Sequence, residues 1–226
     1  MDQASTSALE VVDAIRAMLP AGIALAGGPI GSATSSPFAE ENRAIQRAVE
    51  KRCRQFVAGR QYARSAMAQL GLGPVALGVL PSRAPEWPPG ITGSITHAGS
   101  VCVTLVAPAS DFFGIGVDVE ASTPLSRELH PRICTPDELA ANVTTARGTD
   151  VAKMLFVVKE AFFKAYHPVT GHFLGFLDAD VRLDLARGTF VLELRGGPPG
   201  MLDRRRFEGR CGHAGGYAFA FVALRR

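Results

Sequence analysis

One segment of this chain restricts its fold more than any other: a helix that is apolar nearly all round and carries three charges beyond its first turn. Residues 150–166 have helical spacing, and their apolar members leave no broad polar face. A helix of this composition is buried. Beyond Asp150 and Lys153 of the first turn, its charged members are Lys159, Glu160 and Lys164. Burying a charge is costly unless it is paired or bound to a metal, so these three residues predict a functional site.

Glu160 and Lys164 are four residues apart and share one face of the expected helix. The alternative to a site is an exposed ion pair, which contributes only about 0.3–0.5 kcal/mol. The apolar neighbours weigh against exposure. They are Leu155, Phe156, Val157, Val158, Ala161, Phe162, Phe163 and Ala165.

A second charged motif lies about forty residues earlier, in Gly116-Val117-Asp118-Val119-Glu120. Side chains two apart on a strand point to the same face, so Asp118 and Glu120 lie side by side and their like charges repel. A hard cation such as Mg²⁺ relieves this repulsion and prefers oxygen ligands. The alternative is a strand end at which both acids reach solvent.

Basic and hydroxyl residues provide candidates for phosphate binding. The segment 40–70 reads as a long helix with a possible break near 57–59, and its arginines form either a solvated face or a phosphate-binding face. His97 follows what reads as a turn, 93–96, in which Ser94 and Thr96 carry hydroxyls. These three side chains could donate to a phosphate, although a lone histidine after a glycine turn is more often structural.

The order of the expected elements is helices, then strands, then a helix, then strands, which predicts an α+β fold. Loops are expected at 27–37, 74–89, 171–175 and 196–200. Asp150 should cap the helix 150–166, which His167-Pro168 should end. The remaining expected helices are 7–18 and short pieces within 125–141, starting at 135–138, and the expected strands are 101–107, 113–119, 178–185, 189–194 and 217–224.

Composition excludes several classes of protein. The length of 226 residues fits one large domain or two small ones, and a net charge of +3 does not indicate a nucleic-acid partner. The four cysteines lie far apart, which argues against a zinc site and indicates a reducing, cytoplasmic compartment. The apolar run 21–25 is too short to span a membrane. Neither a dinucleotide-binding fingerprint, a phosphate-binding P-loop nor a nucleophile elbow is present.

Taken in order, the motifs resemble the 4'-phosphopantetheinyl transferase superfamily, and within it the larger, pseudo-dimeric bacterial branch of enterobactin-synthase component D type. The resemblance runs from about residue 43 to the C-terminus. It is carried by Arg52 and Arg60, by Gly93-Ser94-Ile95-Thr96-His97, by 114–120 and by Lys159-Glu160-Ala161-Phe162-Phe163-Lys164. It implies two similar α+β halves, 1–112 and 113–226, related by a pseudo-twofold axis with coenzyme A in the cleft between them.

The resemblance also implies a reaction, the transfer of phosphopantetheine from coenzyme A to a serine of an apo carrier protein, releasing adenosine 3',5'-bisphosphate. Asp118, Glu120 and Glu160 resemble the ligands of Mg²⁺, with Mn²⁺ as an alternative, and Asp118 also contacts the coenzyme. Glu160 is the candidate base. Lys164 resembles the lysine that neutralises the pyrophosphate during catalysis, with Lys159 close by.

Further residues are implied to bind the coenzyme. Arg52, Arg60 and His97 resemble residues that hold its 3'-phosphate, and Thr96 belongs to the same group. Val79 stands where relatives often carry a lysine, a departure for which Arg83 could compensate.

The implied partners are acyl or peptidyl carrier proteins of fatty-acid, polyketide or non-ribosomal peptide synthesis. The segment 125–145 is where family members meet the carrier, with Arg127, Arg132, Leu129 and Ile133 as candidate contacts. A monomer is expected, with neither nucleic acid nor membrane as partner. The alternatives are a homologue that binds coenzyme A or carrier without catalysis, and an unrelated magnesium-dependent phosphohydrolase.

Overall fold

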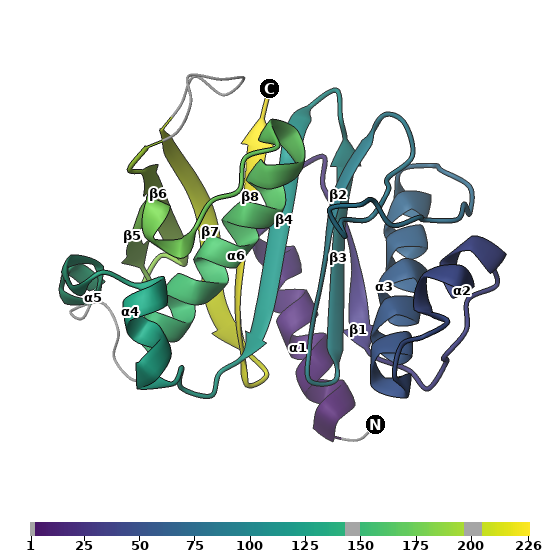
Figure 1. The fold of residues 1–226 in the computed structure, drawn as a ribbon, viewed down its shortest axis with the longest axis horizontal. Helices are drawn as coiled ribbons and strands as arrows, with labels where there is room; N and C mark the ends of the chain where they lie inside the picture. Colours follow the sequence, from purple (N-terminus) through teal and green to yellow (C-terminus); the bar gives the residue numbers. More distant parts are fainter. Residues whose placement is uncertain (1–2, 143–149, 197–204) are drawn as a thin grey trace.

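The computed structural model describes residues 3–142, 150–196 and 205–226. It confirms the α+β class, with two antiparallel sheets side by side and helices over their faces (Figure 1). The first sheet has the strand order β1-β3-β2 and the second has the order β4-β8-β7-β6-β5. The strands are β1 (Ala24–Pro29), β2 (Ile91–Ala98), β3 (Val101–Pro108), β4 (Phe112–Ala121), β5 (Ala179–Asp184), β6 (Thr189–Leu194), β7 (Arg206–Ala214) and β8 (Tyr217–Arg225).

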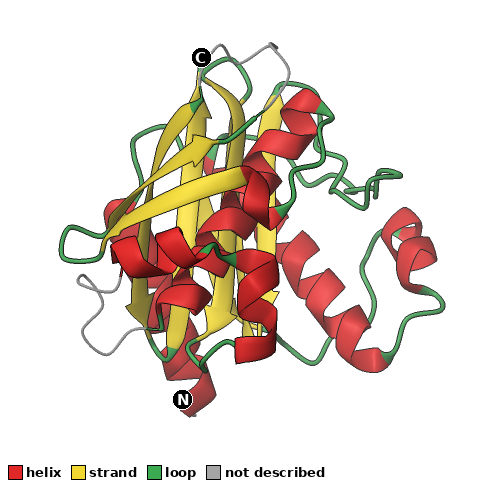
Figure 2. Ribbon diagram, turned by 60° about the vertical axis from the view of Figure 1, so that its left-hand side comes forward, coloured by secondary structure: helices red, strands yellow, loops and turns green. Residues whose placement is uncertain are grey.

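Each sheet carries one twenty-residue helix on the same side of the molecule. In the first half α3 (Glu50–Gln69) packs on β3 and β1, and in the second half α6 (Val151–Thr170) packs on β4 and β8. Figure 2 shows the strands as a central layer with helices against them. The remaining helical elements are α1 (Gln3–Met18), α2 (Ala39–Ile45), η1 (Arg127–Leu129), α4 (His130–Ile133), α5 (Pro136–Asn142) and η3 (Phe176–Asp178).

Helix α1 joins the two halves from the other side. It packs on β1 and β3 of the first sheet and on β7 and β8 of the second. Its apolar face shares one hydrophobic core with Val103, Val117 and Phe219, which come from both sheets. The halves are therefore parts of one folded unit. The division at residue 112 and the pseudo-twofold axis stay predictions.

Several predicted boundaries were wrong because glycines serve close packing rather than loops. Segment 40–70 is broken at 46–49 and not near 57–59, where Gly59 lets α3 approach Ile95 of β2. The predicted loop 27–37 begins inside β1, where Gly27 packs against the backbone of β3. The predicted turn at 93–96 lies within strand β2.

The helix 150–166 was predicted well at its start and too short at its end. Asp150 caps α6 by accepting a hydrogen bond from the backbone N–H of Lys153 at 3.1 Å. Pro168 lies in the last turn and does not end the helix, which continues to Thr170 and closes on Gly171 with a left-handed φ of 70°. Strand β7 was not predicted, since its sequence is largely polar.

No helix in the described part of the chain is long and apolar enough to cross a membrane.

Candidate active site

Two glycines of β4 bring α6 onto the strand. A Cβ atom added at Gly114 or Gly116 would collide with the backbone carbonyl oxygens of Ala165 and Ala161. With no side chains there, the helix backbone lies directly on the strand. Glu160 and Lys164 of the helix are thereby held beside Asp118 and Glu120, which lie on the face of β4 opposite to the buried valines.

Asp118 is the most deeply buried acid of this group. Its side chain is buried, and its Oδ1 accepts hydrogen bonds from Thr96 Oγ1 at 2.9 Å and from Lys164 Nζ at 2.6 Å. The other carboxylate oxygen, Oδ2, is buried and has no hydrogen-bond partner within the described residues. A buried carboxylate oxygen without a partner is unfavourable, so Oδ2 is available for a ligand.

Glu120 and Glu160 are half-buried neighbours of Asp118. Burial raises the pKa of both carboxyls, and the negative charge of Asp118 raises it further. Lys153, which the sequence analysis did not single out, lowers the pKa of Glu120 and so lies near enough to act on it. Raised pKa values in adjacent acids are typical of sites that bind a cation or transfer a proton.

Asp118, Glu120 and Glu160 could hold a divalent metal, although in the described part of the chain their side chains do not converge on one point. Within residues 3–142, 150–196 and 205–226, no three acidic, histidine or cysteine side chains converge closely enough to chelate an ion. The donor set is nevertheless all oxygen, and Asp118 Oδ2 is unpartnered. These features fit Mg²⁺, provided that the side chains of Glu120 and Glu160 turn toward Asp118.

A basic pocket of about 400 Å³ lies in the first half, between α3, β2 and the loop 77–85. Arg52, Arg83 and His97 line it. Arg52 Nη1 lies 2.9 Å from His97 Nε2, and because arginine can only donate, the imidazole accepts. Burial lowers the pKa of His97 and the positive charge of Arg52 lowers it further. The pocket therefore presents arginines beside a neutral histidine.

Arg60 also lines the basic pocket, but most of its guanidinium is engaged with the protein. Its Nε donates to Leu77 O and its Nη2 donates to Gly78 O, both at 3.0 Å, and its guanidinium carbon lies 4.3 Å from the centre of the Phe56 ring. Burial lowers the pKa of Arg60 to about 10. Arg60 therefore shapes the pocket wall and adds positive charge to it.

Val79 and Arg83 face the same basic pocket. A bridge between Val79 and Pro85 closes the loop, and Arg83 sits at its tip with a φ of 69°, a left-handed conformation that is uncommon outside glycine. This turn places the exposed Arg83 at the wall of the basic pocket, to which Val79 contributes no charge. The placement is compatible with the predicted compensation.

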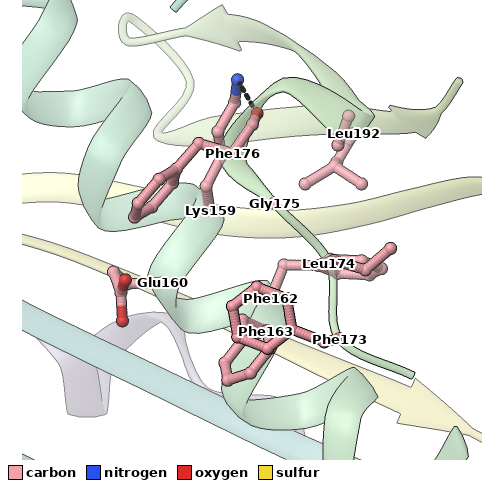
Figure 3. A pocket seen from close by; sticks show the side chains of 10 residues that line it. Lys159, Glu160, Phe162, Phe163, Phe173, Leu174, Gly175, Phe176 and Leu192 are labelled. Atoms are coloured by element: carbon pink, nitrogen blue, oxygen red, sulfur yellow. Dashed lines mark hydrogen bonds between the residues drawn. The ribbon is translucent and has the colours of Figure 1, made fainter. Parts of the chain in front are cut away.

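The ammonium of Lys159, a predicted coenzyme contact, lies apart from the basic pocket and is bound by the protein itself. Its buried Nζ donates to Glu138 Oε2 at 2.8 Å, to Ile133 O at 2.9 Å and to Phe176 O at 2.7 Å. All three ammonium hydrogens are used. Figure 3 shows Lys159 and Glu160 pointing in different directions from consecutive positions on α6. The predicted helix start at 135–138 contained Glu138, yet no sequence signal linked it to Lys159.

Two further pockets that the sequence did not reveal adjoin Glu160. One of about 200 Å³ is apolar, and its walls include Phe162, Phe163 and Leu174 (Figure 3). The other, of about 470 Å³, lies between the halves and is lined by Arg83, Trp87, Ser94, Glu160, Phe163 and Lys164, among other residues.

The three pockets form a series. The basic pocket and the pocket between the halves share Arg83, Pro85 and Ile95. The pocket between the halves and the apolar pocket share Glu160 and Phe163. A long ligand can therefore run from arginines, past Glu160 and Lys164, to an apolar end.

Comparison with known proteins identifies the family to which this arrangement belongs. The 4'-phosphopantetheinyl transferase N-terminal domain family matches residues 40–107, and the 4'-phosphopantetheinyl transferase superfamily matches residues 114–222. The chain is 38% identical over 196 residues to the 4'-phosphopantetheinyl transferase Svp of Streptomyces mobaraensis, which is 83% of this chain and 78% of that protein. This chain belongs to the 4'-phosphopantetheinyl transferase superfamily.

Other members of the superfamily are similar over much of their length. The 4'-phosphopantetheinyl transferase Npt of Nocardia iowensis is 34% identical over 197 residues, 81% of this chain and 87% of that protein. Enterobactin synthase component D of Escherichia coli strain K12 is 35% identical over 141 residues, 61% of this chain and 65% of that protein. The resemblance read from the motifs is thus confirmed for the superfamily, and enterobactin synthase component D is among the relatives that match.

Proposed function

We propose that this protein transfers the 4'-phosphopantetheine arm of coenzyme A to a serine of an apo carrier protein. The observation that carries the proposal is the series of three pockets. Its order of basic wall, Glu160 with Lys164, and apolar wall matches the order of groups along coenzyme A. These groups are the 3'-phosphate, the pyrophosphate and the pantetheine arm.

Each end of the coenzyme has a matching chemistry. Arg52, Arg83 and the charge of Arg60 would hold the 3'-phosphate, since guanidinium groups bind phosphate through paired hydrogen bonds. His97 would donate from the ring nitrogen that does not face Arg52. The apolar pocket beside Glu160 would receive part of the pantetheine arm.

The reaction itself takes place where the halves meet. The serine Oγ of the carrier would attack the phosphorus that bears pantetheine, and the bond from this phosphorus to the bridging pyrophosphate oxygen would break. The serine proton would pass to the carboxylate of Glu160, directly or through a water molecule. The leaving group is adenosine 3',5'-bisphosphate, whose new charge Lys164 would partly neutralise.

A divalent metal is part of the proposal, with Asp118, Glu120 and Glu160 as its protein ligands. When bound, Mg²⁺ would act as a Lewis acid that stabilises the charge on the phosphate oxygens. The unpartnered Oδ2 of Asp118 and the raised pKa values of the two glutamates support this assignment.

The proposed carrier-docking segment follows β4. Arg127, Leu129 and Arg132 are exposed and can contact an acidic partner, whereas Ile133 is buried and the prediction for it was wrong. Residues 143–145 of the predicted segment lie outside the described residues. The mild positive charge of the chain would favour encounter with acidic carrier proteins.

The proposal includes a monomeric protein in a reducing, cytoplasmic compartment. All four cysteines are free thiols, and burial raises the pKa of Cys102 and Cys211 to about 12 in each case. Such thiols are unreactive and impose no requirement for an oxidising environment.

The test is a transfer assay with coenzyme A, Mg²⁺ and a panel of apo acyl and peptidyl carrier proteins, each followed by intact mass. The expected result is a carrier heavier by one phosphopantetheine, dependent on metal and lost in Glu160→Gln. Binding of coenzyme A without transfer to any carrier would instead favour an inactive homologue. Near-normal turnover by Glu160→Gln would overturn its assignment as the base.

A further inference from the structure

The two halves meet along a seam between strands β2 and β4. There, side-chain hydroxyls of β2 accept hydrogen bonds from backbone N–H groups of β4, the part that backbone carbonyls play within a sheet. Strands β2 and β4 are edge strands of their own sheets and face each other across this seam. The backbone N–H of Val117 donates to Ser94 Oγ at 3.1 Å, and that of Val119 donates to Thr96 Oγ1 at 3.3 Å. Ser94 and Thr96 are both buried. The hydroxyls thus satisfy donors of edge strand β4, which faces β2 but belongs to a different sheet.

Thr96 differs from Ser94 by one additional bond. Its hydroxyl donates to Asp118 Oδ1 at 2.9 Å, while Lys164 donates to the same oxygen at 2.6 Å. The two donors approach from different halves of the molecule, β2 and α6. Together they fix the carboxylate with Oδ1 occupied and leave the buried Oδ2 without a hydrogen-bond partner in the part of the chain that the structure describes.

The hydroxyl of Thr96 has no hydrogen left for a second acceptor. A threonine hydroxyl donates one hydrogen, and here it goes to Asp118. The side chain is only 4% exposed, so a coenzyme phosphate could use this hydrogen only if the bond to Asp118 were broken. The predicted role of Thr96 as a direct coenzyme contact is therefore disfavoured for its hydroxyl.

We propose that Thr96 is a positioning residue, which orients the Asp118 carboxylate so that Oδ2 is the oxygen offered to the divalent cation. The hydrogen bond crosses the seam, so the metal-binding geometry depends on how the two halves are docked. Hydrogen-bond partners that orient a ligand typically change metal affinity by about 10–100-fold when removed. The part of this inference that concerns the metal rests on the proposed function, whereas the part that concerns the hydrogen bond does not.

The first experiment needs no metal. A double-mutant cycle of Thr96→Val and Asp118→Ala, measured by urea unfolding of the metal-free protein, should show a coupling of roughly tenfold in the folding equilibrium. The matched control is the cycle of Ser94→Ala with Asp118→Ala, because Ser94 accepts the same kind of seam bond without touching the carboxylate. Ser94 should be additive with Asp118. An additive cycle for Thr96 overturns the positioning role.

The second experiment measures Mn²⁺ affinity by electron paramagnetic resonance in the presence of coenzyme A. Thr96→Val should bind Mn²⁺ about 10–100-fold more weakly and Thr96→Ser should restore the affinity. Thr104→Val should leave the affinity unchanged, because it removes a buried hydroxyl that donates to Gly59 O and lines none of the three pockets. Thr96→Val with the affinity of the wild-type protein would overturn this inference and leave the proposed function intact. A wild-type protein that binds no Mn²⁺ would overturn the metal assignment of the proposed function, and with it the metal role of Thr96.

Discussion

The two halves both lay a twenty-residue helix across a sheet, yet they achieve the close contact by opposite means. In the first half the glycine is on the helix, where Gly59 faces the side chain of Ile95. In the second half the glycines are on the strand, where Gly114 and Gly116 face backbone carbonyls of α6. The contact in the second half is therefore the more rigid one, because a carbonyl oxygen held in a helix cannot rotate away as a side chain can.

The halves also differ in how they use a buried cation on the long helix. Arg60 of α3 and Lys159 of α6 both donate to backbone carbonyls of nearby loops. Lys159 is neutralised by the buried Glu138 and uses all its donors. Arg60 makes no ion pair among the described residues and faces a pocket. Lys159 therefore stabilises the fold, whereas Arg60 contributes positive charge to the basic pocket.

The largest effect should separate the two helix contacts. Gly116→Ala should destabilise the protein by roughly 3 kcal/mol or more, because the new methyl group would press on Ala161 O and force α6 from β4. Gly59→Ala should cost less, about 1–2 kcal/mol, since the contact is with a side-chain methyl group of Ile95 and alanine favours the helix. Urea denaturation measures both. Equal costs would contradict the distinction between a rigid and a yielding contact.

The next effect should separate the two cations. Lys159→Met should cost about 3–5 kcal/mol, because it leaves the carboxylate of Glu138 buried and unpaired, and the double variant with Glu138→Gln should recover part of the loss. Arg60→Met should cost less, about 1–3 kcal/mol, but should weaken coenzyme A binding by about tenfold. Unfolding curves give the stability of each variant, and calorimetric titration gives its affinity for coenzyme A. A folded Lys159→Met, Glu138→Gln protein with the same loss of coenzyme affinity would contradict the comparison.

Much of the second half could be predicted from the sequence, since its signals are local. Asp150 as a cap, the shared face of Asp118 and Glu120, and the apolar surface of α6 follow from helix and strand periodicity alone. What could not be predicted depends on contacts between distant segments. Glu138 is the partner of Lys159, and the hydroxyl of Thr96 reaches Asp118, although nothing near either residue in the sequence indicates this. Gly27 and Gly59 predicted a loop and a helix break, because the sequence alone does not distinguish a glycine in a turn from one at a close packing contact.

A smaller effect is expected in the second half, which carries the three acids. Removing the charge of Glu160 should stabilise the metal-free protein. Burial and Asp118 raise the pKa of Glu160, so the folded protein holds this proton more tightly than the unfolded chain does. The free energy of unfolding should therefore fall as the pH rises from the ordinary glutamate value of 4.5 through the raised folded value. Glu160→Gln should make this fall smaller, with the part due to Glu120 remaining, and should raise the unfolding midpoint of the metal-free protein at pH 7.

The control for this prediction is Glu128→Gln, which removes a carboxylate that is exposed and distant from Asp118 in the chain. It should leave the pH dependence of unfolding as it is in the wild-type protein. A Glu160→Gln variant that is less stable than wild type at pH 7 without metal would show that Glu160 is not repelled by its acidic neighbours.

The central claim is that coenzyme A crosses the seam with its 3'-phosphate in the first half. It is tested most directly by the dissociation constants of coenzyme A and 3'-dephospho-coenzyme A for the wild-type protein, Arg52→Met and Arg47→Met. Arg47 is an exposed arginine nearby that does not line the basic pocket. The wild-type protein and Arg47→Met should prefer coenzyme A by about tenfold or more, and Arg52→Met should lose most of this preference. An undiminished preference in Arg52→Met would contradict the account.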